Sequence, residues 1–325
     1  MINRRNILAT VAVVLPFLIN SQMVLAQQTP LPVVVSFSIL GDIVQNIGGD
    51  RIALTVLVKP GSDAHVYAPT PADAKSVAEA RVIVTNGLKF EGWMTRLVQS
   101  SASKASVVEA TKGIKGRIEK AEAHGHDHGA PKRDKHGHDH GALDPHAWQS
   151  VANVKIYVAN IRETLIAADP SGKAVYEANA LRYLGELERL DAEIKGIVAK
   201  IPADRRKIIT SHDAFGYFQD AYGIRFIAPR GVSTEAEASA KDVARIIQQI
   251  KREKISAVFI ENIADQRLIQ QIARDSGARI GGVLFSDSLT PSGAGDQTGK
   301  ATAPTYILMM RHNIRMISDA LVPNT

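Results

Sequence analysis

The chain has 325 residues and no cysteine, and its 39 Lys and Arg against 33 Asp and Glu give a formal net charge of +6. The absence of cysteine excludes disulfide scaffolds, thiolate metal sites, iron–sulfur clusters and cysteine nucleophiles, so nitrogen and oxygen must hold any metal. At roughly 150 residues per domain the length suggests about two domains. The mild basic excess comes without a dense basic run interleaved with aromatics, so we expect no nucleic-acid partner.

The first 26 residues have the parts of an export signal. Arginines at positions 4 and 5 precede an apolar segment at 7–19, and the small residue Ala26 ends a plausible cleavage site. An N-terminal membrane anchor is the alternative, but the apolar run is short for a bilayer crossing and contains Pro16. We therefore expect residues 1–26 to be a signal peptide and the mature protein to be soluble in an exported compartment.

After the signal, short β-branched runs alternate with amphipathic stretches of helical length. In the first half the expected strands are 33–37, 52–58, 82–84 and 107–108, and the expected helices are 41–47, 71–80 and 93–98. In the second half the expected strands are 207–210, 225–228, 257–260 and 279–284, and the expected helices are 214–222, 240–253, 268–276 and 305–321. Strands separated by helices predict an α/β fold with two Rossmann-like lobes, each a mainly parallel sheet flanked by helices.

A long helical pattern separates the two halves. It opens at Asp169-Pro170 and ends before Pro202. Apolar residues recur in it at steps of three and four, at Val175, Ala178, Leu181, Leu184, Leu187, Leu190, Ile194 and Ile197. A coiled-coil dimer would use the same stripe, but we favour a rigid backbone helix of about 45 Å in a monomer. The expected organisation is a lobe at 27–168, the backbone helix at 169–201 and a lobe at 202–325.

Six of the ten histidines lie in two copies of His-Gly-His-Asp-His-Gly-Ala, at residues 124–130 and 136–142. The glycines predict a mobile, disordered loop at 121–143. A solvated polar loop or a remnant of cloning would explain a duplicated motif inside a folded chain poorly. We interpret the loop as an auxiliary metal-capture segment of moderate affinity, because a flexible array loses chain entropy on binding. Its ligands would be His124, His126, His128, His136, His138 and His140.

Four other residues stand singly where loops follow expected strands or where a helix begins. They are His65, His146, His212 and Asp287. In open α/β sheets ligands collect at the carboxyl ends of strands, so we expect these side chains to converge. Three imidazoles and one carboxylate form a tetrahedral set that suits Zn²⁺. The remaining His312, inside the last expected helix, is interpreted as incidental.

A neighbouring carboxylate accompanies each of the three histidines in sequence. These carboxylates are Asp63, Asp144 and Asp213. Carboxylates that accept a ring N–H commonly orient metal-binding imidazoles. The three aspartates are therefore candidates to orient the rings.

The motifs around these residues resemble those of the solute-binding proteins of zinc and manganese ABC transporters. The resemblance covers nearly the whole mature chain, and the matching segments are Pro60 to Tyr67, Pro69 to Asp73, Asp144 to Trp148, Ser211 to Phe218 with Tyr222-Gly223, and Phe285 to Leu289. The His-rich insert is typical of the zinc branch, and the long central stretch is similar to the backbone helix that joins the two lobes in this family. Ala64 departs from the pattern where proline is common, and no lipidation cysteine is present.

The resemblance implies that His65, His146, His212 and Asp287 bind metal in a cleft between the lobes. Manganese members usually have glutamate at the third position, so His212 points to zinc. The implied function is that of a periplasmic, non-enzymatic protein that captures Zn²⁺ and delivers it to an ABC-type membrane permease. The metal would come through the His-rich loop or from a periplasmic zinc chaperone, and the absence of a lipid anchor implies free movement in the periplasm.

Three alternatives to this interpretation concern the metal and the function. Manganese is the alternative metal, and a zinc buffer or storage protein without a permease is the alternative function. A secreted zinc hydrolase is disfavoured because no His-Glu-x-x-His motif occurs and a fourth protein ligand at Asp287 would close the position that catalytic zinc keeps for water.

Overall fold

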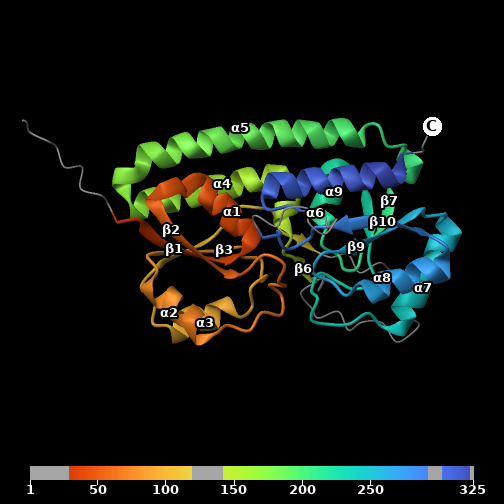
Figure 1. Ribbon diagram of the computed structural model, residues 1–325, viewed down its shortest axis with the longest axis horizontal. Helices are drawn as coiled ribbons and strands as arrows, with labels where there is room; N and C mark the ends of the chain where they lie inside the picture. The colour runs from red at the N-terminus through yellow and green to blue at the C-terminus, as the bar shows by residue number, and fades with distance from the viewer. Residues whose placement is uncertain (1–28, 119–141, 292–301, 323–325) are drawn as a thin grey trace, which may run out of the picture.

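The computed structural model describes residues 29–118, 142–291 and 302–322. Within these ranges two four-stranded sheets lie side by side, and helix α5 (Lys173–Val198) runs along both (Figure 1). The predicted fold class is therefore confirmed: the protein is α/β, with two lobes of parallel sheets flanked by helices and one long helix. The predicted signal peptide and nearly all of the His-rich loop lie outside the described residues.

The N-terminal sheet has the strand order β2-β1-β3-β4, and its strands pair in parallel. The strands are β1 (Leu31–Phe37), β2 (Ile52–Val58), β3 (Val82–Thr85) and β4 (Ser106–Glu109). The helices are α1 (Ser38–Gly48), α2 (Pro71–Glu79), α3 (Met94–Ser100) and α4 (Val151–Ala168). The central strand β1 is buried at six of its seven positions, as expected for a parallel strand covered on both faces by helices.

The C-terminal sheet has the strand order β10-β9-β7-β8 and is also parallel. The strands are β7 (Lys207–Ile209), β8 (Arg225–Ile227), β9 (Ala257–Glu261) and β10 (Arg279–Leu284). The helices are α6 (Gly216–Tyr222), α7 (Ala240–Glu253), α8 (Gln266–Ser276) and α9 (Tyr306–Leu321). Because the strands of each sheet are parallel, their carboxyl ends share one edge, where loops from distant parts of the sequence meet.

Two features were not predicted from the sequence. Helix α4 (Val151–Ala168) packs beside α5, and its bounds were not predicted, since the sequence indicated only that a helix begins near His146. A short antiparallel pair joins β5 (Arg117–Ile118) to β6 (Leu143–Asp144), which flank the His-rich segment in sequence. The paired strands bring Arg117 directly opposite Asp144.

The register predicted for the long helix was wrong in its first half. Val175 and Leu181 are 42% and 74% exposed. The buried face instead runs through Tyr176, Ala180, Tyr183, Leu187, Leu190, Ile194 and Val198. The prediction followed aliphatic residues alone, whereas two tyrosine rings fill the buried positions of the first turns. Asp169-Pro170 opens a single 3-10 turn, and the α-helix begins at Lys173.

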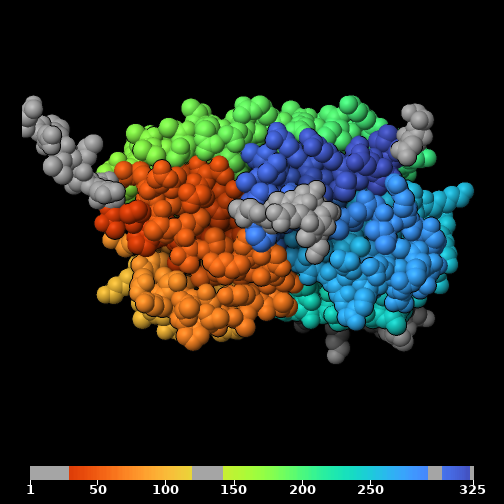
Figure 2. All heavy atoms as spheres, in the orientation of Figure 1, coloured from red at the N-terminus to blue at the C-terminus, as the bar shows by residue number. Residues whose placement is uncertain are grey.

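One apolar core extends from the N-terminal sheet beneath α5 into the C-terminal lobe. At the junction the buried Tyr306 hydroxyl donates to the carbonyl of Trp148 at 2.8 Å, and the Trp148 indole donates to the carbonyl of Ser286 at 2.9 Å. Figure 2 shows the two lobes in contact below α5. The lobes are therefore packed against each other as well as joined by the helix. No helix in the described ranges has both the length and the apolarity needed to cross a bilayer.

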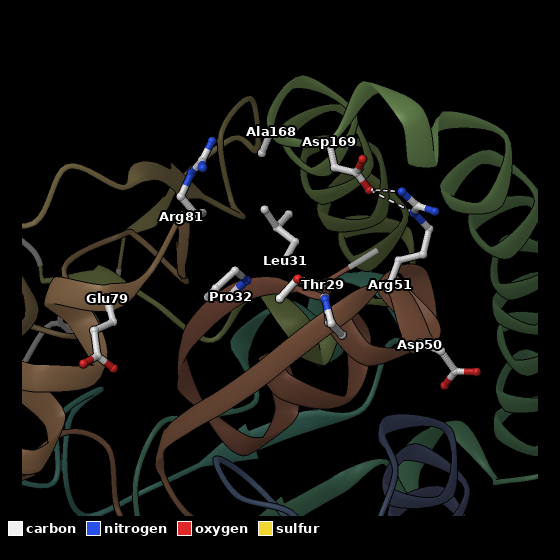
Figure 3. Close-up of a pocket in the computed structure, with 10 residues that line it drawn as sticks. Thr29, Leu31, Pro32, Asp50, Arg51, Glu79, Arg81, Ala168 and Asp169 are labelled. Carbon is white, nitrogen blue, oxygen red and sulfur yellow. Dashed lines mark hydrogen bonds and ion pairs between the residues drawn. The ribbon is translucent and has the colours of Figure 1, made fainter. Parts of the chain in front are cut away.

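An ion-paired turn fixes the start of α5 to the N-terminal sheet. Arg51 donates to one oxygen of Asp169 from Nε at 2.9 Å and from Nη2 at 2.7 Å (Figure 3). Ser171 and Tyr176 donate their hydroxyls to the same carboxylate. Partial burial opposes ionisation, but these three partners lower the pKa of Asp169 to about 2. A hollow of about 720 Å³ opens beside this turn, and none of the predicted metal ligands lines it.

We predict that Asp169→Asn lowers the free energy of unfolding by about 1–2 kcal/mol at pH 7, because the charge-assisted bonds to Arg51 weaken. The folded pKa lies below the unfolded value near 3.8, so this stabilisation is present above about pH 4 and is lost as the pH falls toward 2. Urea denaturation at pH 7 and at pH 3 measures the difference, which should shrink at pH 3. Asp50→Asn, at an exposed neighbour of Arg51, is the matched control and should leave stability unchanged.

Candidate metal centre

The structure brings the four predicted ligand residues together between the lobes. They are His65, His146, His212 and Asp287, and one potential ligand atom from each lies within 4.8 Å of the others. His65 follows β2 and His146 follows β6, whereas His212 follows β7 and Asp287 follows β10. The last three side chains are fully buried, and His65 is 8% exposed.

The ligand atoms face one another without hydrogen-bond partners of their own. Among the described residues no hydrogen bond satisfies Nε2 of the three imidazoles or either carboxylate oxygen of Asp287. The Asp287 oxygens lie 3.4 Å from His65 Nε2, 3.5 Å from His146 Nε2 and 3.2 Å from His212 Nε2. Ligands bound tetrahedrally to zinc at about 2.0 Å are about 3.3 Å apart, so these separations suit one shared cation.

A carboxylate fixes the ring of His146. Asp144 Oδ1 lies 2.9 Å from Nδ1 of that ring and accepts the backbone N–H of the same residue at 3.0 Å. Since a carboxylate accepts, the proton belongs on Nδ1, and the Nε2 lone pair points to the centre. The expectation that Asp144 orients this imidazole is borne out.

A different carboxylate from the expected one faces the ring of His212. Glu261 Oε2 lies 2.6 Å from Nδ1, and Oε1 accepts the backbone N–H groups of Ser211 and His212 at 2.6 and 2.9 Å. Asp213, the sequence neighbour, instead lies 3.9 Å from Arg117. The sequence offered one signal for Glu261: it directly follows the expected strand 257–260, at the same carboxyl edge as the other site residues.

The loop carrying His65 is held by contacts to both lobes. Asp63 accepts the backbone N–H of His65 at 2.8 Å and, with its other oxygen, the hydroxyl of Thr234 from the C-terminal lobe at 2.7 Å. Asp63 therefore positions the backbone of His65, and the expectation that it orients the ring is not met. The carbonyl of Ala64 accepts the indole N–H of Trp93 at 2.9 Å, so this buried alanine lies in an anchored loop.

Aromatic rings shield the imidazoles from solvent. Phe90 meets His65 edge-on with ring centroids 4.7 Å apart, and Trp148 meets His146 at 5.2 Å. Phe90 and Trp148 also contact each other at 4.9 Å. These apolar neighbours lower the local dielectric and strengthen interactions between the buried charges.

The buried charges shift one another's protonation. Burial opposes a positive charge on His212, but Glu261 and Asp287 raise the pKa of its imidazole well above the ordinary value. Burial opposes ionisation of Asp287, but His146, His212 and His65 lower its pKa well below the ordinary value. Glu261 is likewise buried, and His212 lowers its pKa. The centre thus combines ionised carboxylates with imidazoles that face a common point.

The other histidines do not join this cluster in the described part of the chain. His312 lies in α9, and its Nε2–H donates to the carbonyl of Val283 at 2.9 Å. The six histidines of the His-rich segment, from His124 to His140, lie outside the described residues.

Comparison with known proteins gives relatives over almost the whole chain. The manganese-binding lipoprotein MntA of Halalkalibacterium halodurans is 35% identical over 284 residues, covering 87% of this chain and 86% of that protein. The iron-binding protein YfeA of Yersinia pestis is 32% identical, covering 88% and 85%.

Solved structures resemble the fold equally broadly. The periplasmic zinc-binding protein TroA of Treponema pallidum has a TM-score of 0.78 at 30% identity, covering 91% of this chain and all of TroA. A manganese-bound periplasmic metal-binding protein of Candidatus Liberibacter asiaticus has a TM-score of 0.74 at 30% identity, covering 90% of this chain and all of that one.

A family profile described as "Zinc-uptake complex component A periplasmic" matches residues 33–320. The curated relatives include substrate-binding lipoproteins of manganese and other metal ABC transporters. The chain therefore belongs to the zinc-uptake complex component A family of periplasmic metal-binding proteins of ABC transporters.

Proposed function

We propose that the protein captures Zn²⁺ in the periplasm with His65, His146, His212 and Asp287 and delivers it to an ABC-type membrane permease. One observation carries the proposal: four buried ligand atoms from four separate chain segments face one another, and none has a hydrogen-bond partner in the described structure. Leaving several polar atoms unsatisfied in a protein interior costs free energy, which a bound cation would recover.

The choice of zinc rests on the donor atoms. Three imidazole nitrogens and one carboxylate favour a borderline cation, whereas manganese favours oxygen-rich sites. Manganese is the alternative cargo, because relatives such as MntA of Halalkalibacterium halodurans are manganese-binding proteins. The resemblance to the periplasmic zinc-binding protein TroA supports zinc.

Binding and delivery are favoured over catalysis by the closure of the centre. The fourth position around a tetrahedral ion is filled by the fully buried Asp287, whereas catalytic zinc keeps that position for water. Delivery is favoured over storage by the ABC-transporter relatives. A storage protein would bind zinc equally well, so rescue of growth in a zinc-uptake mutant separates the two functions.

One prediction of this proposal concerns the affinity of the centre. Metal-free protein titrated with zinc against a competing chelator should show one tight site, and His212→Ala should remove it by deleting one of four ligands. His312→Ala is the matched control, because His312 is a histidine away from the cluster. Unchanged tight binding in His212→Ala would exclude the assignment. A parallel titration with manganese tests the alternative metal, and tighter binding of manganese than of zinc would support it.

Another prediction concerns Glu261, whose carboxylate faces His212 Nδ1 at 2.6 Å. In Glu261→Gln, an amide N–H toward Nδ1 would move the imidazole proton to Nε2 and block the metal-binding lone pair. With the amide flipped, its NH₂ group would instead face the backbone N–H groups of Ser211 and His212, which would then lack an acceptor. Either arrangement should weaken zinc binding by about 10–100-fold. Chelator competition measures the loss, with Glu253→Gln, paired to Lys207, as the control; equal affinity in both variants would remove Glu261 from this role.

We also propose that the His-rich segment gathers zinc for the centre or receives it from a periplasmic chaperone. Six histidines in two repeated motifs support this role. Deleting residues 122–142 should remove weaker zinc sites seen by calorimetry and leave the tight site intact. A deletion variant with the full wild-type zinc stoichiometry would contradict auxiliary capture.

A further inference from the structure

We propose that Arg117 is a positioning residue for the metal centre, holding Asp144 so that this carboxylate fixes the His146 ring, and tying that arrangement to the C-terminal lobe. The inference rests on the proposed metal-binding function. Arg117 lies on β5, opposite Asp144 on β6. It contacts none of the four proposed ligands through any hydrogen bond or ion pair that the structure shows.

The two oxygens of Asp144 have separate partners. Oδ1 accepts hydrogen bonds from the ring Nδ1 and from the backbone N–H of His146. Oδ2 accepts a hydrogen bond from Arg117 Nη1 at 3.2 Å. Because Asp144 is fully buried, its carboxylate plane is set by these contacts, and the guanidinium holds the side opposite His146.

The guanidinium of Arg117 also meets carboxylates of the C-terminal lobe. Its Nε donates to Asp220 at 3.2 Å, and Nη1 lies 3.9 Å from Asp213. The side chain is only 18% exposed. Burial opposes its charge, but Asp213, Asp144 and Asp220 raise the pKa of Arg117 further above its ordinary value. A planar fork of donors can serve several carboxylates at once, which a lysine cannot do in the same geometry.

The first residue of helix α6, Gly216, leaves room for the Arg117 side chain. A Cβ added at Gly216 would lie 2.2 Å from Arg117 Nη1 and 2.5 Å from Asp144 Oδ2. The next residue, Tyr217, accepts the backbone N–H of Arg117 at 3.0 Å and donates its hydroxyl to the carbonyl of Asp144 at 3.4 Å. The C-terminal lobe thus holds both β5 and β6 against the centre.

Removal of the guanidinium should release this arrangement. Asp144 Oδ2 would be left buried without its cationic donor, so the carboxylate would rotate to find another partner. The imidazole of His146 would then lose its fixed orientation and its preference for a proton on Nδ1. Loss of a group that orients a metal ligand typically weakens metal binding by about 10–100-fold.

The test uses the full chain with Arg117→Gln, Arg117→Lys and Gly216→Ala. Gly216 is not among the positive-φ glycines, so alanine fits the backbone, and its methyl group would displace both the guanidinium and Asp144 Oδ2; this variant therefore tests the paired arrangement of Arg117 and Asp144. Arg267→Gln, at an exposed arginine paired with Asp265, is the matched control. Zinc affinity is measured by chelator competition, and the His146 tautomer is measured by nitrogen-15 NMR of the metal-free protein.

Arg117→Gln and Gly216→Ala should weaken zinc binding by about 10–100-fold. In both variants the nitrogen-15 signals of His146 should indicate a mixture of tautomers in place of the single Nδ1–H form. Arg117→Lys should recover part of the affinity, and the control should match the wild type. Affinity within twofold of the wild type in Arg117→Gln, or an unchanged His146 signal, would overturn the proposal. If that variant does not fold, Arg117→Lys decides, because zinc affinity and a His146 signal equal to those of the wild type would then overturn the proposal. A wild-type protein that binds no divalent metal would overturn the proposed function, while the NMR signal still decides the role of Arg117.

Discussion

The structure holds the Nε2 atoms of three imidazoles and one carboxylate at a common point inside the protein. Buried polar atoms that lack hydrogen bonds are unfavourable, so their neighbours must hold each ring firmly. Asp144 does this for His146, and Glu261 faces the ring of His212. These neighbouring carboxylates matter as much as the ligands, because they determine which ring nitrogen is left for a metal.

This requirement explains the arrangement of the lobes. Each sheet is parallel, so its strands present their carboxyl ends at one edge, and the proposed ligands follow strands in both lobes. Packing at the junction then fixes the distance between the two edges. Trp148 and Tyr306 lie in one continuous core beneath α5, and their hydrogen bonds cross between segments far apart in sequence. This packed junction places the ligand atoms of the two lobes next to each other.

The sequence predicted the two α/β lobes and identified the four residues that the structure places together, because runs of β-branched residues indicate where strands lie and end. It did not predict contacts that depend on tertiary packing. Asp213 was chosen beside His212 by sequence proximity, whereas Glu261 reaches the ring from the neighbouring strand β9. The stripe on α5 was misplaced for a related reason, since the buried rings of Tyr176 and Tyr183 carry hydroxyl groups and do not look apolar in a sequence pattern.

Charge balance links the metal centre to Arg117. Three buried carboxylates, Asp144, Glu261 and Asp287, lie around the imidazoles. Isolated buried charge is costly, so an excess of three negative charges would destabilise the fold. Arg117 offsets at most one of these charges, because it also meets Asp213 and Asp220, so at least two positive charges are still required. In the metal-free protein the raised pKa of His212 supplies part of the missing positive charge. A divalent cation therefore neutralises the negative charge that the protein side chains leave uncompensated. This favours divalent over monovalent cations, whichever metal the protein carries.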